Sequence, residues 1–214
     1  MTITLHGTGL LSPFVMRPVL AARAKGHELN PVPFEGGIKS DAYLALSPMG
    51  KMPLLVDGDL VLPESQPITD YLDAVLDGPK LAPTDAKEAA RTRLIVRLAD
   101  IYLVPHLGAL FAGREKPEGV PAALAGLRDA LGYIEHFRRA GDSHAVGDQF
   151  TVADAALIPL CFFLDMFASQ GMGDMIGANP GLAAWWTRAK ASPIGSRCVA
   201  EQGAALKEML SNRG

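Results

Sequence analysis

The sequence is most informative between residues 47 and 72, where two windows follow each other: Ser47-Pro-Met-Gly-Lys-Met-Pro-Leu-Leu-Val-Asp57 and Leu62-Pro-Glu-Ser-Gln-Pro-Ile-Thr-Asp-Tyr-Leu72. The apolar run 52–56 predicts a strand, and Asp57-Gly58 predicts a tight turn into a second strand at 60–62. A helix is expected to begin at Glu64-Ser65 and to end near Leu76. The windows therefore predict a β-hairpin followed directly by a helix.

Two features of these windows indicate a site for an extended peptide that carries a carboxylate. An X-Pro bond can be cis at modest cost, and a cis Met52–Pro53 bond would turn the backbone N–H and C=O of Met52 outward. Such groups can pair with an extended peptide as an added strand does. Glu64-Ser65 places a hydroxyl and free backbone N–H groups at a helix N-terminus, where a carboxylate binds readily. The alternatives are a trans proline at a strand edge and a simple helix cap.

The residues before these windows alternate strand and helix signals. Residues 2–6 predict a short strand, followed by a loop. Ser12-Pro13 is a strong helix start, because serine is a good N-cap and proline is favoured at the first helical position. That helix is expected to run to about Lys25, with Gly26 as its stop. A second strand at roughly 28–33 and one helical turn near 41–46 complete a small mixed sheet covered by helices.

The second part of the chain has a helical pattern throughout. Residues 78–84 have the composition of a linker, with Asp-Gly-Pro and Ala-Pro-Thr in or beside them. Beyond them, apolar residues at helical spacing predict helices over 85–112, 121–140, 155–163, 180–191 and 195–210. We therefore expect an α/β domain at residues 1–77 and an all-helical domain at 85–214.

Two local patterns in the helical part are expected to be structural. Thr151 and Asp154 form a capping-box-like start in front of the apolar run, and they should contribute to helix initiation without taking part in chemistry. Trp185 and Trp186 are adjacent on one helix, so we expect one in the core and the other partly exposed.

Charge, cysteine spacing and the lack of certain motifs argue against several classes of function. The 214 residues carry a net charge of −3, which gives no reason to expect a nucleic acid as partner. Cys161 and Cys198 are far apart and form no C-x-x-C motif, which favours a reducing cytoplasm. Neither a signal peptide nor a membrane span is expected, because the N-terminus reads as a strand and no long uninterrupted apolar run occurs. Metal-ligand spacing and a glycine-rich phosphate loop are also absent from the sequence.

Taken together, the motifs resemble those of the glutathione transferase superfamily. The two windows are similar to its glutathione-site signature, N/S-P-x-G-K-x-P-x-L followed by E-S-x-x-I-x-x-Y-L. The Thr151–Asp154 box is similar to its S/T-x-x-D folding motif. The N-terminal strand, the loop after it and Ser12 resemble the corresponding segment of the bacterial, serine-type class of cytosolic glutathione transferases. The likeness extends over essentially the whole chain, and it implies a thioredoxin-like glutathione-binding domain followed by an all-helical domain that contributes the electrophile pocket.

The resemblance also implies glutathione as co-substrate, with no metal, and roles for five residues in binding it. Met52 should pair its backbone with the cysteinyl unit, beside a cis Pro53. Glu64 and Ser65 should hold the γ-glutamyl carboxylate, and Lys51 the glycyl end. The sequence departs from many members at residues 66 and 67, where Gln-Pro replaces a pair of small residues, but proline is well tolerated in the first turn of a helix.

Ser12 occupies the position that the resemblance assigns to catalysis. Residues 12–17, Ser-Pro-Phe-Val-Met-Arg, are similar to the S-P-F-x-x-R segment of the serine-type classes, in which the hydroxyl donates a hydrogen bond to the glutathione sulfur. Thr8 carries the other hydroxyl of this loop and is the alternative donor, and a third interpretation makes Ser12 only a helix cap. Serine in place of cysteine argues against thiol-transferase chemistry, which needs a protein sulfur.

The electrophile pocket is expected to involve the first long helix of the second domain. Tyr102 and His106 share one face of it at a spacing of four residues, although Pro105 can bend the helix between them. Packing in the core or at the domain interface is the alternative for both residues.

The predicted function is that of a cytoplasmic, homodimeric glutathione transferase that activates the glutathione thiol for attack on a small hydrophobic electrophile. A glutathione-dependent isomerase, dehalogenase or ether-cleaving enzyme would use the same thiolate. A non-catalytic scaffold that binds a protein partner is the alternative from another class, although loss of Pro53, Glu64 or Ser65 would have favoured it and all three are present.

Overall fold

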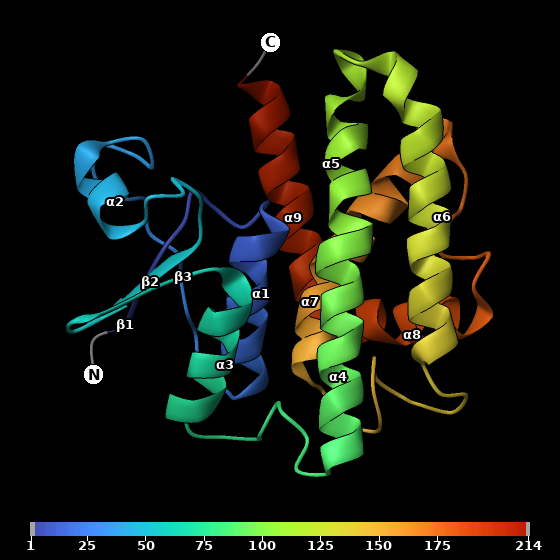
Figure 1. Cartoon of the computed structure of the whole chain (residues 1–214), viewed down its shortest axis with the longest axis horizontal. Coiled ribbons are helices and arrows are strands. Elements are labelled where there is room, and N and C mark those ends of the chain that lie inside the picture. The colour runs from blue at the N-terminus through green and yellow to red at the C-terminus, as the bar shows by residue number, and fades with distance from the viewer. Residues whose placement is uncertain (1–2, 213–214) are drawn as a thin grey trace. The chain divides into compact units, whose positions relative to one another are not determined.

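The computed structural model describes residues 3–212, which form two compact units (Figure 1). One unit contains the residues up to Leu81 together with those from Ser196 onward, and the other contains Ala82–Gly195. The first unit has a sheet and helices, whereas the described residues of the second form helices and loops without a strand. This is the predicted order of an α/β part and an all-helical part.

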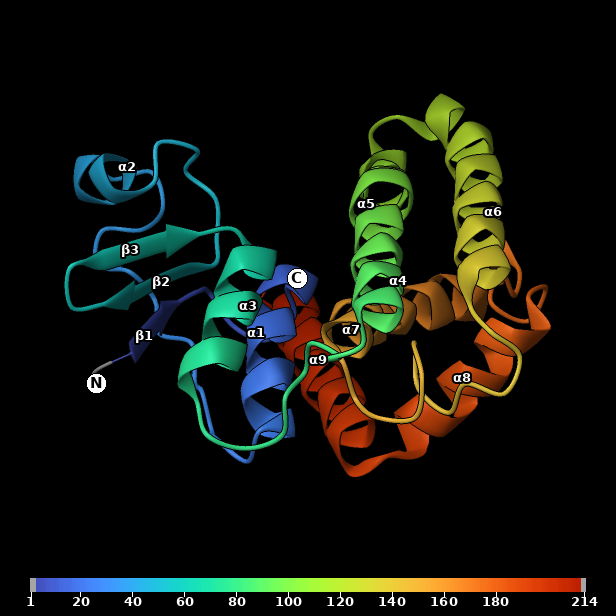
Figure 2. The same cartoon turned by 60° about the horizontal axis from the view of Figure 1, so that its bottom comes forward.

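The first unit is built on an antiparallel sheet of three strands in the order β1 (Ile3–His6), β2 (Leu54–Asp57) and β3 (Leu60–Pro63). The register places Leu5 opposite Leu55, and Leu55 opposite Leu62. Helices α1 (Pro13–Ala24) and α3 (Ser65–Val75) lie side by side on one side of this sheet, and α2 (Asp41–Leu46) lies away from them, beyond the strands (Figure 2). The buried side chains of these elements form the core that fixes the β3–α3 junction.

The strand predicted at residues 28–33 is not formed, and that prediction was wrong. Only one parallel bridge joins this segment to the sheet, between His6 and Val32. Val32 donates its N–H to Leu5 O at 2.9 Å, and its carbonyl accepts from Gly7 N at 3.0 Å. Pro31 and Pro33 flank Val32, and two prolines in so short a segment disfavour a regular strand.

The last helix, α9 (Pro193–Ser211), is associated mainly with the first unit. The division expected from the sequence placed it with the other helices. Arg23 of α1 makes a bidentate ion pair with Glu201, at 2.7 and 2.9 Å. Arg197 binds both carboxylate oxygens of Glu28, at 2.6 and 2.9 Å. These ion pairs attach the C-terminal helix to α1 and to the loop that follows α1 (Figures 1 and 2).

In the second unit, α4 (Ala86–Leu98) continues through a π-helical turn (Ala99–Leu103) into α5 (Val104–Phe111). Val104 donates its N–H to the carbonyl of Ala99, five residues back. Pro105 explains the irregularity, because it has no N–H for the regular bond to Ile101. Helix α6 (Val120–Phe137) packs against α4 and α5, and α7 (Val152–Phe167) packs against α4 and α8 (Pro180–Ala191) (Figure 2).

Several buried hydrogen bonds converge on the start of α7. Thr151 and Asp154 form the predicted capping box. Asp154 also accepts from Ala145 N at 2.8 Å and from Trp185 Nε1 at 2.9 Å. Trp186 donates its Nε1–H to Asp165 at 3.0 Å. Both tryptophans are buried, at 1% and 3% exposure, so the expectation that one would be partly exposed was wrong. Helix α8 packs against both α6 and α7, and each indole N–H reaches a carboxylate.

Two helical stretches, Ala86–Phe111 and Val152–Met172, are long and apolar enough to span a membrane by length and composition alone. The most apolar window of the second is 72% buried inside the fold, and that of the first is 39% buried. A core helix of a soluble protein meets the same criterion, so one or two such stretches are weak evidence for a membrane span.

Candidate functional site

A small pocket of about 120 Å³ lies in the first unit, at the N-terminal end of α3. Three segments far apart in the sequence contribute to it: the first turn of α1, the loop before β2, and the junction between β3 and α3. Its lining residues are Phe14, Met49, Lys51, Met52, Pro53, Pro63, Glu64 and Ser65. The fold thus brings together all five residues for which the resemblance implies glutathione binding.

A buried tyrosine stabilises the loop before β2 through a hydrogen bond. Tyr43 of α2 is fully buried and donates its hydroxyl to the carbonyl of Lys51 at 2.6 Å. Burial raises the pKa of Tyr43, so the hydroxyl stays protonated and remains a donor. Lys39 adds a bond to the carbonyl of Gly50 at 3.3 Å. The Met52–Pro53 bond is cis, as predicted, and Pro53 is a buried lining residue of the pocket, while Lys51 is exposed.

The N-terminus of α3 is not capped by a side chain. Glu64 precedes it with a φ of 71° and makes no side-chain cap bond. A positive φ costs a non-glycine residue free energy, and such strain concentrates at ligand sites. The first turn contains no acidic residue, and Ser65 is buried at 4% exposure. Ser65 lines the pocket, and the first amide groups of a helix have no intrahelical acceptor, so this end of α3 offers donors suited to a carboxylate.

Ser12 is the N-cap of α1. Its Oγ accepts from the N–H of Val15 at 3.4 Å, which leaves the hydroxyl hydrogen available for donation. Thr8, the alternative donor, is engaged with a sulfur atom in this structure. Its N–H and its hydroxyl lie 3.2 and 3.1 Å from the Sδ atom of Met52. The loop that contains Thr8 can therefore donate two hydrogen bonds to a sulfur.

Some lining residues were not anticipated from the sequence. Phe14, Met49 and Pro63 line the pocket, and Ser12 is two residues from Phe14 but is not itself a lining residue. Phe14 could have been predicted as a lining residue, because it lies in the first turn of the helix whose N-terminus was already expected to be part of the site. The positive φ of Glu64 had no signal, since glycine is the usual residue in that conformation.

Tyr102 and His106 belong to the second unit. Tyr102 lies in the π-helical turn, is 46% exposed and makes an edge-to-face contact with Tyr133 of α6. His106 is half-buried and lies on Gly126 of α6, where an added Cβ atom would be 2.2 Å from His106 Nε2. The absence of a side chain at residue 126 therefore makes room for the imidazole ring.

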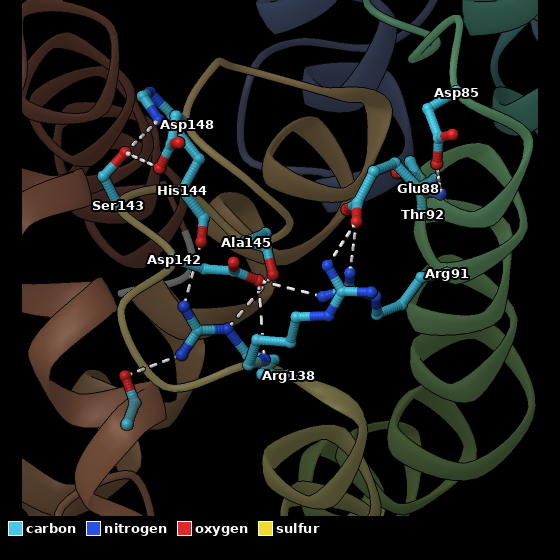
Figure 3. A network of polar contacts seen from close by, with 12 residues as sticks. Asp85, Glu88, Arg91, Thr92, Arg138, Asp142, Ser143, His144, Ala145 and Asp148 are labelled. Atoms are coloured by element: carbon cyan, nitrogen blue, oxygen red, sulfur yellow. Dashed lines mark hydrogen bonds and ion pairs between the residues drawn. The ribbon is translucent and has the colours of Figure 1, made fainter.

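A larger pocket, of about 420 Å³, lies in the second unit beside Glu88, Arg139 and Asp142. Three of its charged lining residues, Glu88, Arg139 and Asp142, belong to a network of ion pairs, part of which Figure 3 shows. Arg91 binds Glu88 and also Asp142, and Glu88 is shared with Arg139. Arg138 donates to the carbonyls of Ala145, His144 and Gly181. This network joins α4 to the loop that precedes α7, so we interpret these charges as structural.

The described residues offer no protein thiolate and no metal cluster. Burial raises the pKa of both cysteine thiols, Cys161 strongly and Cys198 to about 12, so both remain protonated at neutral pH. Within residues 3–212, no group of three or more His, Cys, Asp or Glu side chains could hold a metal ion.

Comparisons with known proteins agree with the geometry. The model for the glutathione S-transferase N-terminal domain matches residues 9–80, and that for the C-terminal domain matches residues 112–188. Glutathione S-transferase 3 of Zea mays is 32% identical over 209 residues, which cover 89% of this chain and 90% of that protein. A glutathione S-transferase of Hyoscyamus muticus is 28% identical, over 93% of this chain and 98% of that protein.

A solved structure shows the same fold at lower identity. The crystal structure of glutathione transferase F7 from Populus trichocarpa superposes with a TM-score of 0.76 at 22% identity, over 94% of this chain and 99% of that one. Both domain models match in the expected order, and the maize relative aligns over most of both proteins. The chain therefore belongs to the glutathione S-transferase family and is a transferase.

Proposed function

We propose that the chain binds reduced glutathione in the pocket at the start of α3 and transfers it to a small hydrophobic electrophile. The observation that carries the proposal is the uncapped, strained N-terminus of α3, with Ser65 buried beside it. The γ-glutamyl carboxylate would accept from the first amides of α3 and from the Ser65 hydroxyl. The main chain of Met52 would pair with the cysteinyl unit, and Lys51 would attract the glycyl carboxylate.

In this proposal, Ser12 activates the glutathione sulfur. A free thiol titrates near pH ~8.5, and each unit by which its pKa falls requires about 1.4 kcal/mol of preferential stabilisation of the thiolate. A hydroxyl donor at a helix N-terminus supplies about one to two units. Ser12 fits because its Oγ already accepts from Val15, so its hydrogen is free to point toward the sulfur. The resulting thiolate attacks the electrophile directly.

Conjugation through the glutathione thiolate is favoured over thiol–disulfide exchange. Exchange would need a protein thiolate to form a mixed disulfide. Cys161 and Cys198 are buried, and burial raises the pKa of both thiols. We expect neither to react with iodoacetamide in the native protein, and both to react after denaturation, as intact-mass spectrometry would report.

The proposed donor is tested by substituting each hydroxyl in turn. In Ser12→Ala, the pKa of the bound glutathione thiol should rise by about one to two units, with a corresponding loss of turnover at neutral pH. Thr8→Ala should leave that pKa unchanged. Ultraviolet difference absorbance of the thiolate, followed against pH, measures both. The reverse outcome would assign the role to Thr8, and no effect of either substitution would contradict activation by a hydroxyl.

Loss of the cap is a second consequence of Ser12→Ala, and it needs its own control. The substitution removes an N-cap worth about 1 kcal/mol. Asp85→Ala is the matched control, because Asp85 caps α4 through Lys87 N at 3.0 Å and Glu88 N at 2.9 Å and is not among the pocket residues. It should lower stability by a similar amount and leave the thiol pKa unchanged.

The electrophile is proposed to contact Tyr102 and His106. Tyr102→Ala and His106→Ala should then raise the KM for an aryl halide several-fold, with the affinity for glutathione unchanged. An unaltered KM in both variants would remove these residues from the site.

Retention on glutathione resin without turnover of any electrophile would instead favour the alternative of a non-catalytic scaffold that binds a protein partner. We further propose a homodimer, for which light scattering should give twice the chain mass of 22.7 kDa.

A further inference from the structure

A buried glutamine of the C-terminal helix binds the backbone next to Ser12. Gln202 of α9 is fully buried. Its side-chain Nε2 donates to the carbonyl of Leu11 at 3.2 Å, across 191 residues of sequence. Both residues belong to the first unit. The bond therefore ties the end of the chain to the peptide that precedes the proposed sulfur donor.

The amide of Gln202 is itself oriented by a neighbour one helical turn earlier. The Cys198 thiol is fully buried and donates to Gln202 Oε1 at 3.3 Å. Burial raises the pKa of Cys198 to about 12, so the thiol keeps its hydrogen at neutral pH. Because Oε1 accepts from Cys198, the amino group is the part of the amide that reaches Leu11.

Holding the Leu11 carbonyl also orients Ser12. The peptide bond is planar, so the direction of the Leu11 carbonyl fixes the direction of the Ser12 N–H. Ser12 then has φ −64° and ψ 123°, its carbonyl accepts from Met16 N at 2.9 Å, and its Oγ accepts from Val15. With the peptide fixed on one side and the first turn of α1 on the other, the hydroxyl has few remaining orientations.

Other contacts attach α9 to the first unit without reaching this peptide. Glu201, the residue before Gln202, pairs with Arg23 near the C-terminal end of α1. Arg197 pairs with Glu28 and Glu201. Adjacent residues of one helix therefore have separable contacts, with Glu201 attaching the helix and Gln202 attaching the Leu11–Ser12 peptide.

We propose that Gln202 is a positioning residue, which acts through the Leu11 carbonyl to hold the Ser12 hydroxyl in the orientation that stabilises the glutathione thiolate. The inference rests on the proposed function of Ser12. The C-terminal helix is thereby a component of the thiol-activating site as well as of the core.

The test compares Gln202→Leu with Glu201→Gln in the full-length chain. Gln202→Leu keeps the volume and removes the donor, so the pKa of the bound thiol should rise by about half a unit to one unit, and kcat at neutral pH should fall by about three- to tenfold. The KM for glutathione should stay within about twofold, because its carboxylates bind elsewhere. Glu201→Gln should lower the melting temperature and leave the thiol pKa unchanged.

Two further variants keep the test decisive. Cys198→Ala removes the thiol that donates to Gln202 Oε1, so it should shift the pKa of the bound glutathione thiol in the same direction by a smaller amount. This variant serves if Gln202→Leu does not fold. The double variant Ser12→Ala/Gln202→Leu should shift the pKa no further than Ser12→Ala alone, because Gln202 acts through Ser12.

The outcomes separate this inference from the function it rests on. If Ser12→Ala shifts the thiol pKa but Gln202→Leu and Cys198→Ala do not, the role of Gln202 is refuted and that of Ser12 stands. Equal shifts in Gln202→Leu and Glu201→Gln would show a general effect of loosening α9 and would also refute it. If Ser12→Ala leaves the pKa unchanged, the proposed function of Ser12 fails and the inference fails with it.

Discussion

Two helix N-termini in this protein start from similar sequence signals and have opposite structures. Helix α7 begins with a complete capping box, in which Asp154 is buried and accepts from Thr151, Ala145 and Trp185. Helix α3 follows Glu64, which has a positive φ and provides no side-chain cap, and its first turn contains no acidic residue. The donors of α7 are thus satisfied inside the protein, whereas those of α3 open into a pocket.

The difference shows what distinguishes a helix terminus that only stabilises the fold from one that can bind a ligand. Both ends have the same unpaired amides and the same partial positive charge. At α7 the fold supplies the compensating carboxylate, and this contributes to stability. At α3 no side chain of the protein supplies this carboxylate, so the unpaired amides are left to bind the carboxylate of a ligand. The substitutions below, in decreasing order of expected effect, test this division.

The largest effect is expected from Asp154→Asn. The substitution replaces an oxygen that accepts buried hydrogen bonds with an amino group, which leaves at least one donor unsatisfied. The free energy of unfolding should fall by about 3 kcal/mol or more, measured by urea denaturation. Asp129→Asn, at an exposed position on α6, is the control and should change it by less than about 0.5 kcal/mol. Equal stability of the two variants would show that Asp154 is not the structural centre of the second unit.

Ser65→Ala should have the next largest effect, on binding and not on stability. Loss of a hydrogen bond to a carboxylate weakens binding by about ten- to a hundredfold. Isothermal titration with reduced glutathione measures the change. Thr151→Ala is the matched variant at the other terminus, and it should lower stability by about 1 kcal/mol with the affinity for glutathione unchanged. A similar loss of affinity in both variants would erase the distinction between the two termini.

Glu64→Gly is expected to have the smallest effect, with stability and affinity moving in opposite directions. Glycine adopts a positive φ without steric cost, so thermal stability should rise by about 1 kcal/mol. The affinity for glutathione should fall, because the side chain is lost. Glu64→Ala keeps the β-carbon and hence the strain, so it should lower affinity without any gain in stability. If Glu64→Gly were no more stable than Glu64→Ala, the positive φ would store no strain.

Local signals predicted most of the fold. The Ser12-Pro13 start, the hairpin at Asp57-Gly58 and the Thr151–Asp154 box each depend on a few neighbouring residues, and each is present. The strand expected at 28–33 failed for a local reason as well, because the prolines that flank Val32 deserved more weight than the extended pattern around them.

Long-range features could not be read from the sequence. Nothing near Gln202 indicates that it binds Leu11, and nothing near Glu201 indicates a partner at Arg23, because these contacts depend on how α9 packs. The burial of both Trp185 and Trp186 likewise follows from α8 lying against two other helices. For the site, Lys51, Met52, Pro53, Glu64 and Ser65 were predicted by motif and line one pocket, while Met49 and Pro63 were identified only by the folded structure.

The most direct test of the central claim is to titrate the ¹⁵N-labelled full-length chain with reduced glutathione and follow its backbone amide resonances. If the uncapped terminus of α3 holds the γ-glutamyl carboxylate, the amides of Ser65 and Gln66 will shift, while those of Val152 and Ala153, at the capped start of α7, will stay in place. Saturation with glutathione that leaves the Ser65 and Gln66 amides unshifted would contradict the account.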